Sequence, residues 1–217
     1  IAMEMRRMLS HPTRAEAVEL LRDVGLLEAI LPEAFAANPD DWAAMMRALK
    51  AYGDGDFAVA LALVLRFSGV VGGKRVTPRS LQQRWRLSNE ETQRMEDALA
   101  MESVLLEADK LPWPVVQRQL IRENARGSLG YVQALAETLS TRKEGIQFCL
   151  NRLSWPTEKL NPTPLVTGDD LVALGLRPGR HFKAVLDRIR DLQLEGKLTA
   201  KEAALDEARR LAEESAA

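Results

Sequence analysis

The sequence predicts an all-α fold, an elongated array of many helices with no sheet. Apolar residues recur at helical spacing along most of the chain, and no stretch of six residues between turns alternates apolar and polar side chains. No repeat period appears either. With 217 residues, the chain is long enough to bury a sizeable core, as one elongated domain or two small ones.

Composition and charge are those of an ordinary globular protein. Apolar residues make up 46% of the chain and charged residues 28%, and the net charge is −1. The single cysteine, Cys149, excludes an internal disulfide, and its place on an apolar helix face indicates a core residue. The longest apolar run, residues 57–65, is too short to span a bilayer, and residues 1–9 are too charged for a secretion signal. We therefore expect a cytoplasmic protein that binds no membrane.

The helices can be placed from the residues that start and stop them. The chain opens in helical pattern, without an initiator methionine or a capping residue, so we expect a fragment of a longer protein. His11-Pro12 breaks this first helix. A Ser or Thr followed three residues later by Glu is typical of a capping box and predicts helix starts at Thr13, Ser88, Thr141 and Thr199. Other helices are expected after Asn38, at Phe57, after Thr77, after Pro112 and at Gly130.

The remaining segments differ in hydrophobicity and in glycine and proline content. Residues 57–66 are apolar on nearly all sides, which predicts a buried helix at the centre of the fold. Residues 53–56 and 69–75 are predicted to be loops. The sequence Asn-Pro-Thr-Pro at 161–164 is expected to form a stiff linker between two subdomains.

Residues 166–190 hold the most informative pattern: a helix, a tight turn and a second helix. Thr167 and the two aspartates that follow Gly168 are typical of a helix start, because a hydroxyl caps a free N–H group and carboxylates suit the positive end of the helix dipole. Gly175 would end this helix with the positive φ that such a position usually needs. Arg177-Pro178-Gly179 then forms a rigid turn into a second helix that runs to about Glu195.

The turn and the second helix carry an excess of positive charge. Asp187 is the one acid among five basic residues: Arg177, Arg180, Lys183, Arg188 and Arg190. A helix N-terminus presents free N–H groups and partial positive charge, so a phosphate can bind at the start of this helix. A corner with solvated arginines and no ligand is equally compatible with the spacing.

The pattern T-G-D-D-L-V-A-L-G-L-R-P-G, followed by L-E-G-K-L-T-A-K-E-A-A-L, resembles the C-terminal segment of the class II tRNA nucleotidyltransferase and bacterial poly(A) polymerase family. This resemblance covers about residues 166–211. A second one lies at the start of the chain. Ile1-Ala2-Met3-Glu4-Met5 and the stretch from Gly25 to Glu33 are similar to the passage from neck to body in the same family. Two separated matches in the family's order are stronger than either alone.

The resemblance implies the RNA-binding C-terminal region of a template-independent RNA nucleotidyltransferase, either a tRNA CCA-adding enzyme or a poly(A) polymerase. The family's catalytic head would precede residue 1 and would use Mg²⁺ and ATP or CTP. No cofactor and no catalytic residue are expected in this chain. Its task would be to position the RNA 3′ end for the head, which with the neck would be its partner in the same polypeptide. The implied domains are the end of the neck and start of the body (1–34), a helical body (35–156) and a tail (157–217).

Residues 65–69 depart from the family pattern. Many members carry Leu-His-Asp-x-Gly here, within a metal-dependent phosphohydrolase domain. This chain has Leu65-Arg66-Phe67-Ser68-Gly69, and neither arginine nor phenylalanine supplies the imidazole or carboxylate ligands of such a site. No metal site is therefore expected. Three of the four pairs of adjacent carboxylates lie at predicted helix starts, where capping explains them without catalysis.

RNA would be held through its phosphate backbone by lysines and arginines. The candidate contacts lie at the corner and at the first helix: Arg177, Gly179, Arg180, His181, Lys183, Arg6 and Arg7. Arg14 could extend the same face. A middle cluster could do so as well, although solvated helix faces around a packed Trp85 explain it better: Lys74, Arg75, Arg79, Arg84 and Arg86.

Two other functions are compatible with the sequence. A non-enzymatic helical adaptor would bind a protein through its Leu- and Met-rich faces and would show a large exposed apolar patch instead of a basic stripe. A helix-hairpin-helix DNA-binding module would depend only on Leu176 to Gly179. The choice between CCA addition and poly(A) synthesis stays open, because the residues that decide it would lie upstream.

Overall fold

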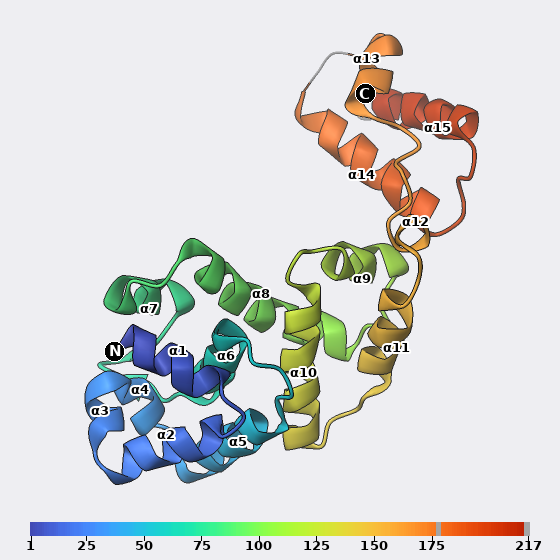
Figure 1. Cartoon of the computed structure of the whole chain (residues 1–217). Helices are drawn as coiled ribbons and strands as arrows, with labels where there is room; N and C mark the ends of the chain where they lie inside the picture. Colours follow the sequence, from blue (N-terminus) through green and yellow to red (C-terminus); the bar gives the residue numbers. More distant parts are fainter. Residues whose placement is uncertain (177–178, 215–217) are drawn as a thin grey trace. The chain divides into compact units, whose positions relative to one another are not determined.

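The computed structural model describes residues 1–176 and 179–214, and for Arg180, His181 and Glu214 it describes the backbone alone (Figure 1). The described residues form fifteen helices and one two-stranded hairpin. The all-α prediction is confirmed. The hairpin, at residues expected to form a loop, is the one departure from the absence of a sheet. The chain divides into two compact units, residues 1–110 with 122–152 and residues 111–121 with 153–217.

The first unit holds most of the helices. Its elements are α1 (Ala2–Ser10), α2 (Arg14–Asp23), α3 (Leu26–Ile30), α4 (Pro32–Phe35), α5 (Pro39–Ala51), α6 (Phe57–Phe67), β1 (Val70–Val71), β2 (Lys74–Arg75), α7 (Pro78–Trp85), α8 (Asn89–Leu106), α10 (Ala125–Leu139) and α11 (Glu144–Leu153). The second unit holds α9 (Trp113–Leu120), α12 (Thr157–Leu160), α13 (Gly168–Ala173), α14 (Arg180–Leu194) and α15 (Lys201–Glu214). Helix α10 begins at Ala125, five residues before the predicted start at Gly130.

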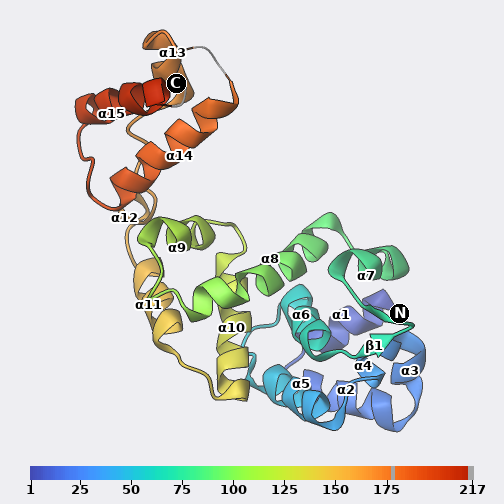
Figure 2. The same ribbon diagram turned by 180° about the vertical axis from the view of Figure 1, so that it is seen from behind.

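Helix α6 is the centre of the first unit, as its apolar sequence predicts. Every residue from Phe57 to Phe67 is buried except Arg66. Helices α1, α5, α8 and α10 pack around it, and both views show it among its neighbours (Figures 1 and 2). Each buried Leu, Val or Phe side chain contributes about 1.5–3 kcal/mol relative to exposure, so this helix supplies much of the unit's stability. Cys149 on α11 is fully buried, which confirms it as a core residue, and burial raises the pKa of its thiol to about 11.

Two of the expected helix caps form. Ser88 accepts the backbone N–H of Glu91 while the Glu91 carboxylate accepts the N–H of Ser88, and Thr167 and Asp170 do the same at the start of α13. These reciprocal bonds satisfy N–H groups that have no partner inside the helix, so they fix where α8 and α13 begin.

The other three predicted caps are wrong. Thr13 makes no side-chain bond to α2, because its hydroxyl lies 2.8 Å from Nδ1 of His11, and that nitrogen also accepts the Thr13 backbone N–H. Helices α11 and α15 begin at Glu144 and Lys201, so neither Thr141 nor Thr199 occupies the position directly before its helix. A short sequence pattern proposes a cap, but local competition for the hydroxyl decides whether it forms.

The hairpin of β1 and β2 replaces the loop predicted at residues 69–75. Val70 pairs with Arg75 and Val71 with Lys74 in antiparallel register. Gly72 and Gly73 connect the strands with φ of 59° and 76°. A two-residue hairpin turn of the common kind needs positive φ at both positions, and adjacent glycines adopt it without strain.

The second unit has a small core of its own. Buried residues from α13, α14 and α15 and the segment before them form it: Val166, Leu171, Val185, Ile189, Ala204 and Ala208. The predicted corner is confirmed in its helices and in Gly175, whose φ is 80°. Helix α9 joins this unit because Arg118 binds Asp191 on α14 at 2.6 Å and Gln117 donates to the carbonyl of Leu160. Among the described residues, no helix has the length and hydrophobicity needed to cross a bilayer.

Candidate nucleic-acid interface

Helix α1 turns its apolar face to the core and its polar face to solvent. Met5 and Leu9 are buried, whereas Glu4 and Arg7 are exposed. Arg7 makes one ion pair among the described residues, with Glu4 at 3.3 Å, and 69% of its side chain is exposed. His11, at the C-terminal end of the same helix, is also exposed. Arg7, one of the two candidates that the sequence predicts on α1, therefore has an accessible guanidinium.

Arg6, the other candidate on α1, is held by its neighbours. Its Nε and Nη2 donate to the two carboxylate oxygens of Glu91 at 2.5 and 2.9 Å. Its guanidinium also lies 5.6 Å from the ring centroid of Phe57. The bond to Glu91 raises the pKa of Arg6, and the same bond lowers the pKa of Glu91. Arg6 therefore ties α1 to α6 and α8, while its Nη1 makes no hydrogen bond with the described residues and can bind another ligand.

Arg14 does not extend a surface, and that expectation is wrong. The residue is 2% exposed. Its guanidinium donates to three backbone carbonyls, those of Leu9 (2.9 Å), Tyr52 and Asp54 (2.6 Å). It also lies 5.0 Å from the ring centroid of Tyr52. Arg14 thus joins the corner between α1 and α2 to the loop before α6, because carbonyls buried there need donors that the loop itself does not supply.

The middle cluster separates into paired and free cations. Arg79 binds Glu96 at 2.7 Å and Arg84 binds Glu33 at 3.0 Å, while Trp85, the residue after Arg84, is buried. The interpretation as helix faces around a packed tryptophan is confirmed for these two arginines. The three other residues are exposed and make no ion pair with the described part of the chain: Lys74, Arg75 and Arg86.

The hairpin is fixed to the N-terminal segment at Gly69. The N–H of Gly69 donates to the carbonyl of Glu33 on α4 at 2.7 Å. The approach is so close that a Cβ on Gly69 would lie 2.2 Å from the carbonyl oxygen of Ala36. Lys74 and Arg75 therefore project from a turn that is anchored beside α4.

The corner of the second unit lies partly outside the described residues. Arg177 is not among the described residues, and neither are the side chains of Arg180 and His181. Gly179 is exposed and extended, with φ −175°, and it precedes α14 without a side-chain cap. Lys183 is exposed on the first turn and makes no ion pair with the described residues. The start of α14 thus combines an uncapped helix end with a free lysine.

Two charged residues near this corner are committed to the fold. Arg190 donates to the carbonyl of Pro162 at 2.6 Å and to Oδ1 of Asn161 at 2.7 Å, and burial lowers the pKa of its guanidinium. Asp170 binds Lys201 at 2.7 Å, and this contact, with hydrogen bonds from Thr167, lowers the pKa of the carboxyl to about 2. Arg190 is therefore not free to bind a phosphate, and Asp170 neutralises Lys201.

Arg66 and Phe67, at the position where the resemblance would place metal ligands, make other contacts. Arg66 donates from Nε to Glu102 at 3.0 Å, and Phe67 is buried. The hydroxyl of Tyr131 donates to the same carboxylate at 3.1 Å. Within residues 1–176 and 179–214, no three His, Cys, Asp or Glu side chains gather as metal ligands would.

The comparisons with known proteins agree with the N-terminal resemblance. Residues 1–38 match the family model described as "Probable RNA and SrmB- binding site of polymerase A". The match spans α1 to α4, the segment that Arg6, Arg14 and Glu33 join to the rest of the first unit. No curated protein and no solved structure matches the chain. The resemblance is thereby confirmed where the chain begins, and residues 1–38 are similar to the RNA-binding region of the poly(A) polymerase family.

Proposed function

We propose that this chain binds the 3′-terminal part of an RNA and holds it for nucleotide addition by a polymerase head elsewhere in the same polypeptide, as a CCA-adding enzyme or a poly(A) polymerase would. The match of residues 1–38 to an RNA-binding region carries the proposal. A rigid helical body suits the task, because bringing a 3′ hydroxyl to a nucleotide is mainly a matter of orientation.

Particular exposed cations, and not overall charge, would make the contacts. Residues 1–38 hold four arginines and six acids, so this segment has no general attraction for phosphates. Three of the arginines lie over aromatic rings: Arg6, Arg14 and Arg22. Arg7 remains, and we propose it as the main phosphate contact of α1, with Nη1 of Arg6 as a further donor. In the second unit, Gly179 and Lys183 take this role, together with Arg177, Arg180 and His181.

Fluorescence anisotropy with a tRNA acceptor and T-arm helix tests these contacts. Arg7→Ala is expected to weaken binding about 3- to 10-fold and to lower the slope of log affinity against log salt by roughly one between about 50 and 200 mM salt. Gly179→Glu places a negative charge at the start of α14 and is expected to weaken binding similarly. The extended backbone at Gly179 accepts any residue, so the melting temperature should not fall.

Arg47→Ala is the matched control, because Arg47 is exposed on α5, outside the matched segment. Its affinity should stay within about twofold of the parent chain. Unchanged binding by Gly179→Glu would remove the corner from the interface, and unchanged binding by Arg7→Ala would remove α1.

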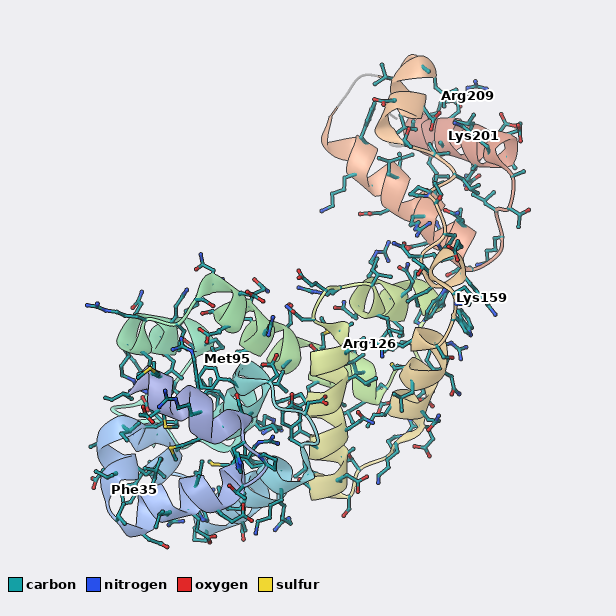
Figure 3. The ribbon with its side chains drawn as sticks, in the orientation of Figure 1. Phe35, Met95, Arg126, Lys159, Lys201 and Arg209 are labelled. Atoms are coloured by element: carbon teal, nitrogen blue, oxygen red, sulfur yellow. The ribbon has the colours of Figure 1, made fainter. Side chains whose placement is uncertain are left out.

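A second candidate function, protein docking, is favoured by the apolar residues that the same segment exposes. Leu20, Val24 and Leu26, around the corner between α2 and α3, are 61%, 57% and 52% exposed. Phe35 on α4, labelled in Figure 3, is 37% exposed. The family description also names SrmB as a partner of this region. A protein can cover such side chains, whereas phosphates gain nothing from them.

Leu20→Glu combined with Leu26→Glu is expected to weaken binding of purified SrmB at least about tenfold, because a charge is costly at the desolvated centre of an interface. Surface plasmon resonance on the full chain measures this affinity. Val70→Glu, on the exposed hairpin, is the control and should bind SrmB like the parent chain. RNA affinity should not fall in the double variant. Equal SrmB binding by the double variant and the parent would exclude docking at this corner.

A further inference from the structure

A pocket of about 370 Å³ lies in the first unit where α6, α8 and the start of α10 meet. Its lining residues come from these three helices and the turn before α10: Asp56, Val59, Arg94, Glu123, Asn124, Gly127 and Ser128. Figure 3 labels two neighbours of this lining, Met95 beside Arg94 and Arg126 beside Gly127. Pockets for small molecules usually measure about 300–1,000 Å³, so this one suits a single small group.

The buried hydroxyl of Ser128, in the lining of the pocket, has no hydrogen-bonding partner among the described residues. The residue is 1% exposed, and its Oγ makes no hydrogen bond within the described part of the chain. A buried hydroxyl without a partner is destabilising, which is why most buried polar groups are satisfied. The other serine and threonine hydroxyls buried in this unit donate to carbonyls, as Ser68 does to Val64 and Thr138 to Ala134. Ser128 is the exception, and it lines a pocket.

The start of α10 is uncapped on the same side. Asn124 occupies the capping position but makes no side-chain bond to the helix, and its Nδ2 donates to Asp97 at 2.9 Å. First-turn N–H groups of α10, that of Gly127 among them, are therefore left without a capping side chain. Gly127, one of these residues, lines the pocket.

The charged side chains of the lining are preorganised by bonds within the protein, and their net charge favours a neutral ligand. Asp56 accepts the N–H groups of Ala58 and Val59 through Oδ1 and binds Arg94 through Oδ2 at 2.8 Å. Arg94 also binds Glu90. Asp56 and Glu123 together outnumber the one guanidinium in the lining, so a free phosphate would meet net negative charge. The lining offers carboxylates as hydrogen-bond acceptors, backbone N–H groups as donors and one hydroxyl that can act as either. This set suits a ligand that carries donors and acceptors on one edge.

We propose that this pocket binds one unpaired nucleoside of the RNA. The inference depends on the proposed function for its source of nucleosides. Single-stranded RNA is commonly read by turning a base out of the strand and bonding its edge. Here Ser128 and the N–H groups of α10 bind base or ribose acceptors, Asp56 and Glu123 accept from amino or hydroxyl groups, and Val59 with Gly127 supplies an apolar wall. The matched segment contacts residues close in sequence to the lining, since Arg6 binds Glu91 on α8 and lies over Phe57, the residue after Asp56.

Titration of the ¹⁵N-labelled full chain with adenosine, cytidine, guanosine and uridine tests the pocket. At least one nucleoside is expected to shift the amide signals of Gly127 and Ser128 in a saturable way, while inorganic phosphate leaves them in place. Ser128→Ala should weaken this binding about 3- to 10-fold and leave the melting temperature equal or higher, because it removes an unpaired buried hydroxyl. Gly127→Ala should also weaken it, since the added Cβ would lie 3.3 Å from Cγ2 of Val59 and narrow the pocket.

Ser103→Ala, an exposed serine on α8, is the matched control and should bind nucleosides as the parent does. Several results would overturn the proposal: no saturable shift with any nucleoside, equal shifts with phosphate, or full binding by Ser128→Ala. RNA anisotropy on the same samples separates the two proposals. If the RNA helix binds but nucleosides do not shift the amide signals of Gly127 and Ser128, the pocket proposal is wrong and the proposed function stands. If nucleosides bind and the RNA does not, the proposed function fails instead.

Discussion

Arg14→Ala is expected to lower the free energy of unfolding of the first unit by about 3–5 kcal/mol. The substitution removes the donors of three carbonyl bonds and leaves the acceptors of Leu9 and Tyr52 buried without partners. It also empties the space over the Tyr52 ring. Urea unfolding followed by far-UV circular dichroism measures the loss.

Arg47→Ala is the matched control for this measurement, because it removes the same side chain from an exposed position on α5. It should change the stability by no more than about 0.5 kcal/mol. Arg14→Lys should recover only part of the stability, since an ammonium group cannot reproduce the planar fork that reaches three carbonyls. A loss below about 1 kcal/mol for Arg14→Ala would contradict the buried role that we assign to this residue.

Gly69→Ala is expected to destabilise the first unit by about 3 kcal/mol and to release the hairpin from α4. The new Cβ would lie 2.2 Å from the carbonyl oxygen and 2.6 Å from the carbonyl carbon of Ala36. Both atoms belong to the backbone and cannot turn away as a side chain could. The bond from the N–H of Gly69 to Glu33 would be lost with the displacement. Thermal unfolding and hydrogen exchange at Val70 and Val71 report the two effects.

Gly53→Ala provides the comparison, because nothing lies within 4 Å of a Cβ at Gly53 and its φ is not positive. This variant should be as stable as the parent or slightly more so, since alanine restricts the unfolded chain. If the two glycine variants unfolded at the same temperature, the close approach at Gly69 would not be a constraint on the fold.

The sequence predicted best where structure depends on neighbouring residues. The two helices of the corner and the positive φ of Gly175 follow from signals within a few positions of one another, and they were confirmed. The apolar run of α6 likewise predicted its own burial. The loop prediction at residues 69–75 is wrong, although a Gly-Gly pair between Val-Val and Lys-Arg is typical of a hairpin turn.

Features made by distant contacts were not predictable in this way. Arg14 resembles any surface arginine until Tyr52 and Asp54, 38 and 40 residues later, place their carbonyls around it. The lining of the pocket comes from three helices, and Ser128 carries no local sign that its hydroxyl is unpaired. Local rules also failed at Thr13, where His11 competes for the cap.

The positions of Arg7 and Lys183 on exposed turns agree with the candidates predicted from the sequence, and their RNA contacts stay predictions.

The bonds of Arg14 have a practical consequence for any experiment that transplants the segment matched by the family model. The family match ends at residue 38, yet the carbonyls that hold Arg14 belong to residues 52 and 54, and the carboxylate that holds Arg6 belongs to residue 91. A peptide cut at the edge of the match would lose these partners and could not keep α1 and α2 at their present angle. The matched segment is therefore smaller than the unit that folds, and a portable version would have to include helices as far as α8.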